Sequence, residues 1–196
     1  MNDKTKNIAV FASHGGSNLQ AIIDGCLAGK INANVCVVIS NNGGAKALER
    51  AKNAGIPAVH LSEKTHQNNL APETLKTLQF YKADIIFLAG YLKKIPDNVL
   101  LCYKNRIFNI HPSLLPKYGG RGMFGINVHK AVLAAGETET GITIHRVTAE
   151  YDRGDILMQK KVPVLPNDTP EVLAARVLGQ EHINIVEFLG GEYEHF

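Results

Sequence analysis

The 196-residue sequence has no tryptophan, only three cysteines and no long uninterrupted apolar run. Cys26, Cys36 and Cys102 include no CxxC pair, which argues against a disulfide framework or a cysteine-based zinc site. All three lie in apolar segments, so we expect buried thiols in a reducing, cytoplasmic compartment. No apolar run approaches the roughly 18 residues of a membrane span. The polar stretch Met1–Asn7 lacks a signal-peptide core, so we expect no membrane contact.

Charge is modest in amount and mixed in sign. Charged residues make up 20% of the chain, hydrophobic residues 45%, and the formal net charge is +3, which is ordinary for a folded globular protein. No dense Lys/Arg run is present, so we expect no nucleic-acid partner, whereas a slight positive excess suits an anionic small molecule. The eight histidines are scattered without an HExxH motif, so we expect no bound metal.

Short apolar runs alternate with longer amphipathic segments, a pattern typical of strands alternating with helices. Strands are predicted over Asn7–Ala12, Asn34–Ser40, Ala58–Leu61, Asp84–Ala89 and Arg106–Ile110, and helices over Ser17–Leu27, Ala45–Ala54, Asn68–Tyr81 and Asp97–Cys102. Two later strands, Gly141–Val147 and Asp155–Val164, are expected to pair antiparallel before a long helix over Thr169–Leu189. We therefore predict one α/β domain over residues 1–196, with a Rossmann-like, mostly parallel sheet and helices on both faces.

The loop after the first predicted strand is rich in glycine and small polar residues. It reads Ser13-His14-Gly15-Gly16-Ser17-Asn18 and leads into a helix. Free N–H groups at a helix start attract anions, and glycines allow close approach, so this loop can hold a phosphate. The alternative is a plain turn in which Ser17 caps the helix, and the residues alone leave the two interpretations about equal.

A second polar cluster follows the strand that ends near Ile110. Asn109 and His111 are two residues apart, so both side chains project from one face of that strand near its carboxyl end. An amide and an imidazole there can stabilise an oxyanion and handle a proton, as acyl transfer requires. Asp152, in a later turn, is a candidate to raise the histidine pKa. The competing interpretation is a structural Asn–His pair and an ordinary Asp-x-Gly turn.

The chain resembles the folate-dependent formyltransferases over nearly its whole length. The matching stretches are Gly15–Asp24, Phe87–Ile95, Phe108–Gly120, Gly141–Val164 and Arg176–Val186, which include the sequences GGSNLQAIID and FNIHPSLLPKYGG. HPSLLP with an upstream Asn and a downstream Asp-x-Gly is specific as a set, and GSNLQ resembles the branch of the family that formylates glycinamide ribonucleotide. The resemblance implies a single α/β domain that uses 10-formyltetrahydrofolate as co-substrate and needs no metal.

The resemblance also implies site residues. The implied catalytic residues are Asn109, His111 and Asp152; the implied ribonucleotide contacts are Gly16, Ser17, Asn18 and Glu181; and the implied folate contacts are Tyr91, Leu92, Lys93, Lys94, Ile95, Arg106, Asn109, Ala149, Glu150 and Tyr151. In the implied mechanism, the substrate amine attacks the formyl carbon, Asn109 and protonated His111 stabilise the oxyanion, and Asp152 keeps His111 charged. The expected partners are small molecules only, and the chain is expected to be a monomer or homodimer.

Three features leave alternatives open. His14 replaces a glycine usual in such loops and is expected to point to solvent. The segment Gly119–Val128 is longer and richer in glycine than usual, which suggests a mobile lid, with Arg121 expected in solvent. His145 precedes Asp152 and is expected to be structural rather than functional. The competing functions are another formyltransferase such as a sugar-nucleotide N-formyltransferase, a formyl-folate hydrolase, a methionyl-tRNA formyltransferase, and a phosphate-binding module without catalysis.

Overall fold

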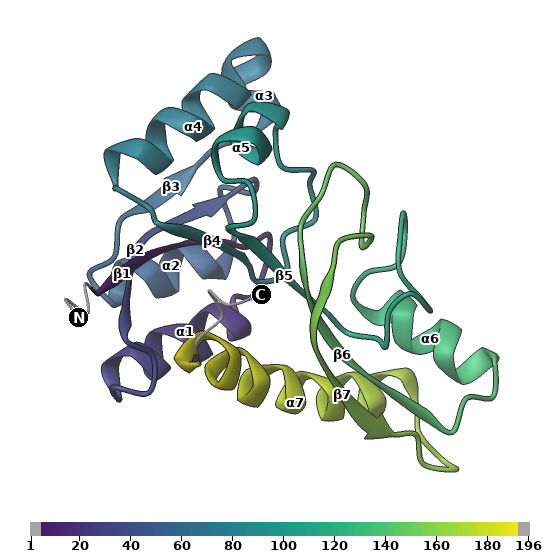
Figure 1. Cartoon of the computed structure of the whole chain (residues 1–196). Coiled ribbons are helices and arrows are strands. Elements are labelled where there is room, and N and C mark those ends of the chain that lie inside the picture. The colour runs from purple at the N-terminus through teal and green to yellow at the C-terminus, as the bar shows by residue number, and fades with distance from the viewer. Residues whose placement is uncertain (1–4, 192–196) are drawn as a thin grey trace.

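The computed structural model describes residues 5–191 of the chain (Figure 1). Its strands are β1 (Lys6–Phe11), β2 (Ala33–Ser40), β3 (Ala58–His60), β4 (Ile85–Leu88), β5 (Ile107–His111), β6 (Glu139–Arg146) and β7 (Ile156–Pro163). Its helices are α1 (Ser17–Leu27), α2 (Lys46–Asn53), α3 (Glu63–His66), the 3₁₀ turn η1 (Gln67–Asn69), α4 (Leu70–Phe80), α5 (Asp97–Cys102), α6 (Ile126–Ala134) and α7 (Pro170–Gly190). Every strand and helix predicted from the sequence is present, with ends displaced by one or two residues.

The strands form one seven-stranded sheet in the order β3-β2-β1-β4-β5-β6-β7. The first five strands in that order are parallel to one another, whereas β5 with β6 and β6 with β7 pair antiparallel. This confirms the expected mixed sheet. Because the carboxyl ends of β1, β2, β4 and β5 lie at one edge, the loops that follow these strands gather there.

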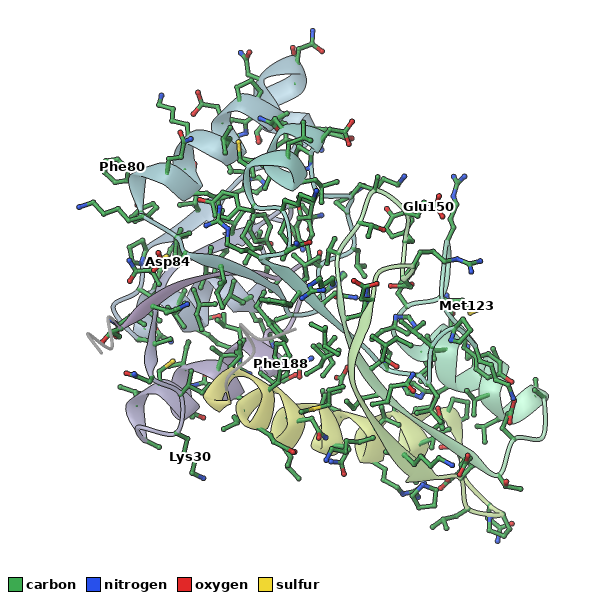
Figure 2. The ribbon with its side chains drawn as sticks, in the orientation of Figure 1. Lys30, Phe80, Asp84, Met123, Glu150 and Phe188 are labelled. Carbon is green, nitrogen blue, oxygen red and sulfur yellow. The ribbon has the colours of Figure 1, made fainter. Side chains whose placement is uncertain are left out.

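Two apolar layers cover the two faces of the sheet, because alternate residues of a strand point to opposite sides. In β1, Ile8 and Val10 pack into a layer with α1, α2, α6 and α7, while Ala9 and Phe11 pack into a layer with α4 and α5. Phe188 of α7 meets Phe108 of β5 edge to face, with ring centroids 5.3 Å apart, and Figure 2 shows Phe188 between the helix and the sheet.

The structure corrects three local predictions. The segment Gly119–Val128 is not loop throughout, since α6 begins at Ile126, with Val128 and Val132 fully buried one turn apart. Gly16, rather than Ser17, precedes α1 as its capping residue, and its left-handed backbone (φ 70°) suits glycine. The thiol of Cys102 is exposed at the end of α5 and not buried. Among residues 5–191, no helix has both the length and the apolar character to cross a bilayer.

Candidate functional site

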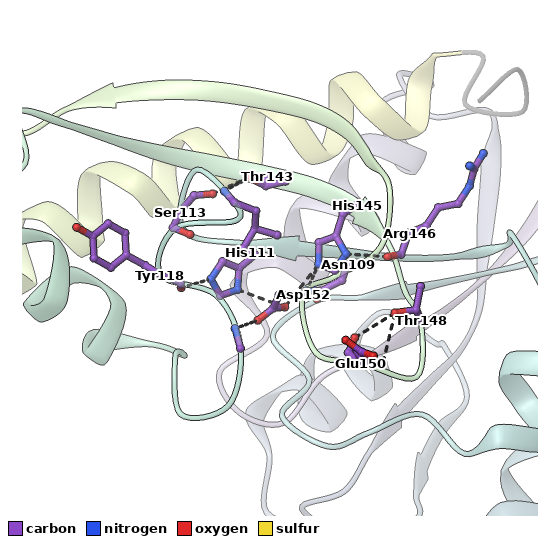
Figure 3. Close-up of polar contacts among 12 residues, drawn as sticks. Asn109, His111, Ser113, Tyr118, Thr143, His145, Arg146, Thr148, Glu150 and Asp152 are labelled. Atoms are coloured by element: carbon purple, nitrogen blue, oxygen red, sulfur yellow. Dashed lines mark hydrogen bonds and ion pairs between the residues drawn. The ribbon is translucent and has the colours of Figure 1, made fainter.

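His111 is the last residue of β5 and is almost completely buried. Each of its two ring nitrogens has one polar neighbour (Figure 3). Its Nε2 is 2.8 Å from the carbonyl oxygen of Tyr118, and its Nδ1 is 3.6 Å from Asp152 Oδ1. A carbonyl oxygen only accepts, so the hydrogen bond places the imidazole proton on Nε2. Nδ1 is therefore the nitrogen that gains or loses a proton, and it faces a carboxylate.

The balance of charge and burial at His111 differs from the sequence-based expectation. Burial lowers the pKa of His111, and the nearby carboxylate of Asp152 raises it by less, so that the pKa lies below its ordinary value. The direction of the His111 pKa therefore does not support the prediction that Asp152 keeps His111 protonated. Burial outweighs the carboxylate because Nδ1 lies 3.6 Å from Asp152 Oδ1, an ion-pair distance and not that of a short hydrogen bond.

Asp152 lies in the turn between β6 and β7 and has a left-handed backbone, with φ 54°. Its Oδ2 accepts a hydrogen bond from the Gly120 backbone N–H at 2.8 Å, and its Oδ1 is 3.6 Å from His145 Nε2. Burial alone would raise the Asp152 pKa, but His145, His111 and the Gly120 N–H together bring it below its ordinary value. Asp152 is therefore an ionised carboxylate beside two imidazoles.

His145 is a residue that sequence reasoning treated as structural but that the structure places in the site. Its Nδ1 lies 2.7 Å from the Arg146 carbonyl oxygen, which fixes a proton on Nδ1. In the neutral ring, Nε2 then accepts from the Asn109 amide, whose Nδ2 is 3.0 Å away. His145 thus fixes the orientation of the Asn109 amide, with Nδ2 directed toward the imidazole. The signal available in the sequence was register, because Asn109 pairs with His145 across β5 and β6.

A cavity of about 370 Å³ brings the predicted catalytic residues together with two of the predicted ribonucleotide contacts. Asn109, His111, Asp152, Asn18 and Glu181 all line it. Asn18 Nδ2 donates to Glu181 Oε2 at 3.1 Å, and burial raises the pKa of Glu181 to about 7. The Asn18 Oδ1 atom is buried without a hydrogen-bond partner, so it is available to a ligand donor.

The remaining two predicted phosphate contacts lie at the start of α1, beside this cavity rather than in its wall. Gln20 N–H is bonded to the Gly16 carbonyl oxygen, so the N–H groups before it emerge from the helix end. A Cβ on Gly16 would lie 2.8 Å from Ala47 of α2, so this position has no room for a side chain. Ser17 lines a separate groove between α1 and α7. His14 is exposed, as expected.

Most predicted folate contacts line a second cavity, of about 330 Å³, on the other side of Asn109. One wall contains Tyr91, Lys93, Lys94 and Ile95, and the opposite wall contains Ala149, Glu150 and Tyr151. The Lys94 ammonium lies 5.3 Å from the centre of the Tyr151 ring, which links the two walls. Leu92 lines the first cavity and a larger open one of about 1040 Å³ instead, and Tyr91 and Tyr151 border all three.

Arg106 is the predicted folate contact that the structure does not bring to these cavities. It precedes β5 at the opposite end of the strand from His111. Its guanidinium donates to the carbonyl oxygens of Asp84 and Cys102 and lies over the Tyr103 ring. The prediction is wrong because nearness in sequence to Asn109 does not bring a residue to the same end of an extended strand. Within the described residues, no cluster of three His, Cys, Asp or Glu side chains is arranged to hold a metal.

Comparison with known proteins gives a consistent result. Residues 6–189 match the model of the family described as formyl transferase. The chain is 45% identical over 190 residues to the chloroplastic phosphoribosylglycinamide formyltransferase of Arabidopsis thaliana, covering 95% of this chain and 65% of that protein. It is 40% identical over 178 residues to the phosphoribosylglycinamide formyltransferase of Escherichia coli K12, covering 90% of this chain and 82% of that protein.

Among solved structures, glycinamide ribonucleotide transformylase 1 from Symbiobacterium toebii superposes with a TM-score of 0.91 at 38% identity, covering 100% of this chain and 90% of that one. The chain thus spans slightly less than two-thirds of the plant relative but most of the bacterial ones. The match extends over both cavities, over the strand that carries Asn109 and His111, and over the turn that carries Asp152. This chain belongs to the formyl transferase family.

Proposed function

We propose that this protein transfers the formyl group of 10-formyltetrahydrofolate to the amine of glycinamide ribonucleotide, a step of purine (IMP) biosynthesis. One observation carries the proposal: Asn109, His111 and Asp152 meet in a cavity that also holds Asn18 and Glu181. The relatives named phosphoribosylglycinamide formyltransferase, at 40% identity or more over most of this chain, support the same acceptor.

The two cavities divide the substrates between them. The ribonucleotide occupies the one lined by Asn18 and Glu181, with its phosphate at the N–H groups that begin α1. The folate ring occupies the one between Tyr91–Ile95 and Ala149–Tyr151. Asn109 and Asp152 line both cavities, so the formyl carbon and the amine meet beside them. Bringing two substrates together in this way lowers the entropic part of the barrier.

The transfer is direct. The amine nitrogen forms a bond to the formyl carbon, and the carbonyl oxygen becomes an oxyanion that the Asn109 amide stabilises by a hydrogen bond. Collapse of this intermediate breaks the bond from the formyl carbon to the folate nitrogen. The proton lost by the amine is balanced by the proton that the leaving folate nitrogen gains. No covalent intermediate with the protein is required.

His111 is placed to accept the amine proton, because burial lowers its pKa and so favours an unprotonated Nδ1. Asp152 then stabilises the imidazolium that forms, at a distance of 3.6 Å from Nδ1. The same proton is afterwards available to the folate nitrogen. In this scheme Asp152 stabilises the imidazolium form of His111 after the proton transfer, and His111 is neutral before it.

A spectrophotometric transfer assay tests the proposal. The protein is mixed with a 10-formyl folate analogue, with and without glycinamide ribonucleotide, and deformylation is followed. We expect deformylation only when the ribonucleotide is present, and we expect His111→Ala to lower kcat by roughly 100-fold or more. His66→Ala, which changes a histidine on α3 outside the two cavities, serves as the matched control and should retain full activity.

The outcomes separate the competing functions. Deformylation without any acceptor would identify a hydrolase. Deformylation that needs a sugar-nucleotide amine instead of glycinamide ribonucleotide would identify a different formyltransferase. Binding of both compounds without turnover would contradict the proposed catalysis and would indicate a binding module. The single-domain organisation, the cytoplasmic location, the lid and the monomeric or dimeric state stay predictions.

A further inference from the structure

One short backbone segment contacts both His111 and Asp152. The Tyr118 carbonyl oxygen accepts from His111 Nε2 at 2.8 Å, and the Gly120 N–H donates to Asp152 Oδ2 at 2.8 Å (Figure 3). Between them, Gly119 is packed so closely that a Cβ there would lie 2.5 Å from Leu115 Cδ2 and 3.2 Å from Asp152 Cβ. The separation of His111 from Asp152 is therefore set by the position of this segment.

Tyr118 holds the segment in a conformation that a tyrosine rarely adopts. Its φ is 56°, in the left-handed region that L-residues other than glycine, asparagine and aspartate disfavour. Such a residue persists only where its surroundings over-determine it. The contact that holds Tyr118 here is the hydrogen bond that its hydroxyl donates to Glu137 Oε1 at 2.8 Å. The Lys117 ammonium donates to the same oxygen at 2.8 Å but does not contact the Tyr118 side chain.

We propose that Tyr118 is a positioning residue for His111. Its side chain, anchored on Glu137 just before β6, fixes the backbone carbonyl that holds the imidazole with its proton on Nε2 and turns Nδ1 toward Asp152. Without the anchor, the carbonyl moves away and the neutral ring samples both tautomers. A ring with its proton on Nδ1 has no lone pair on that nitrogen and cannot accept the amine proton there.

Three other titratable groups face His111 from different elements. Asp152 approaches from the turn after β6, His145 from β6, and His129 from α6. Of the neighbours, Asp152 and the Tyr118 carbonyl raise the His111 pKa, whereas His145 lowers it. Loss of the carbonyl contact should therefore lower the pKa of His111 further, and the acid limb of the pH profile for kcat should move to lower pH.

The test uses the full-length protein labelled with ¹⁵N at its histidine rings. The His111 signals are identified by their absence from His111→Gln, and their ¹⁵N shifts report which ring nitrogen carries the proton. We expect Nε2 protonated and Nδ1 bare in the wild type at alkaline pH. In Tyr118→Phe and in Glu137→Ala we expect shifts averaged between the tautomers, a lower His111 pKa, and a kcat reduced roughly threefold to tenfold.

Two matched variants complete the test. Glu137→Gln keeps an oxygen acceptor for the Tyr118 hydroxyl and should restore the wild-type tautomer and pH profile. Lys117→Met removes the other partner of Glu137 without touching Tyr118, and should behave as the wild type. The proposal is overturned if Tyr118→Phe and Glu137→Ala keep a single Nε2-protonated ring and an unmoved acid limb. It is also overturned if Lys117→Met causes the same change, since general loosening of the loop would then suffice.

The kcat measurement rests on the proposed function, but the ring-nitrogen measurement does not. If no formyl transfer is detected, the proposed function fails, and the tautomer experiment still decides on Tyr118. If transfer is detected and the tautomer is unaffected by the variants, the proposed function stands and Tyr118 is not a positioning residue.

Discussion

His111 and Glu181 face the same cavity from different elements, and burial acts against the charge of both. It lowers the pKa of His111 and raises the pKa of Glu181 to about 7. Burial thus disfavours the charged form of both a base and an acid in one cavity, a combination typical of functional sites. The consequences are measurable one residue at a time.

Glu181→Gln should stabilise the protein at alkaline pH. The pKa of Glu181 rises from 4.5 to about 7 on folding, so the folded state is penalised as pH rises above 4.5, and the penalty is complete above about 7. Its upper bound is on the order of 3 kcal/mol. Urea unfolding at about pH 8 should show the variant more stable than the wild type, with the difference shrinking as pH falls toward 4.5.

The same variant should bind glycinamide ribonucleotide more weakly, because a carboxylate accepts more strongly from donors than an amide does. Equal stability of the two proteins at alkaline pH would contradict the conclusion that burial raises the pKa of Glu181. Asn18→Ala is a useful companion, since it removes the 3.1 Å hydrogen bond that partly offsets the burial of Glu181.

His145→Ala should lower kcat while leaving the binding of folate nearly unchanged. The variant removes the acceptor that orients the Asn109 amide and one of the two imidazoles beside Asp152. Loss of two such contacts corresponds to roughly a tenfold to hundredfold effect. Steady-state kinetics would show this as a change in kcat with little change in KM. A change confined to KM would mean that His145 serves the folate cavity and not the orientation of Asn109.

The sequence identified residues better than it identified their conformations. Asn109 and His111 were recoverable from strand register and Asp152 from its turn, because period-two alternation fixes which side chains share a face. The left-handed backbone of Tyr118 was not recoverable, since tyrosine does not favour a φ above zero, whereas aspartate at position 152 is a residue type that tolerates one. Arg106 was misplaced because proximity along the chain was read as proximity in space.

At the scale of elements, the repeating pattern of apolar residues predicted almost everything. Buried strands such as β4 show as continuous apolar runs, and α7 shows its start in Thr169, whose hydroxyl accepts from the Val172 N–H, followed by Pro170. The helical elements that the sequence did not predict are the short α3 with the 3₁₀ turn η1, and α6. The reason is clearest for α6. The glycine-rich stretch before α6 predicts a loop, and the only helical signal is the i, i+4 spacing of Val128 and Val132. That signal is too short to predict a helix against the local composition.

Two Gly→Ala changes should act in opposite directions. Gly179 lies inside α7, where an added Cβ meets nothing within 4 Å, so Gly179→Ala should stabilise the protein by about 0.5–1 kcal/mol. Gly154 follows Asp152 by two residues, and an added Cβ would lie 1.8 Å from the Arg146 carbonyl oxygen. Gly154→Ala should destabilise the protein and displace Asp152, with loss of activity. Thermal unfolding and kcat measured together would check both; a neutral Gly154→Ala would refute the close packing of that turn.

For the whole molecule, the buried histidines predict that stability rises toward neutral pH. Burial is the main cause that lowers the pKa values of His111, His129 and His182 from 6.5, so the unfolded chain takes up more protons than the folded one as pH falls through that value. Stability is therefore present above pH 6.5 and lost below it. Glu181 acts in the opposite sense between pH 4.5 and about 7, so the profile is measured in Glu181→Gln, where the histidines act without it. Urea midpoints should rise from about pH 5.5 to neutrality, and a flat profile would contradict the burial of the histidines.

One wall of the cavity proposed for the ribonucleotide contains a hydrogen bond between Asn18 and Glu181, two residues 163 positions apart in the chain. One belongs to the first helix and the other to the last, and α1 and α7 pack side by side (Figure 1). During synthesis the sheet edge and the folate walls can assemble while α7 is still inside the ribosome. The acceptor pocket cannot. The pocket proposed for the ribonucleotide is therefore complete only after α7 has packed against α1.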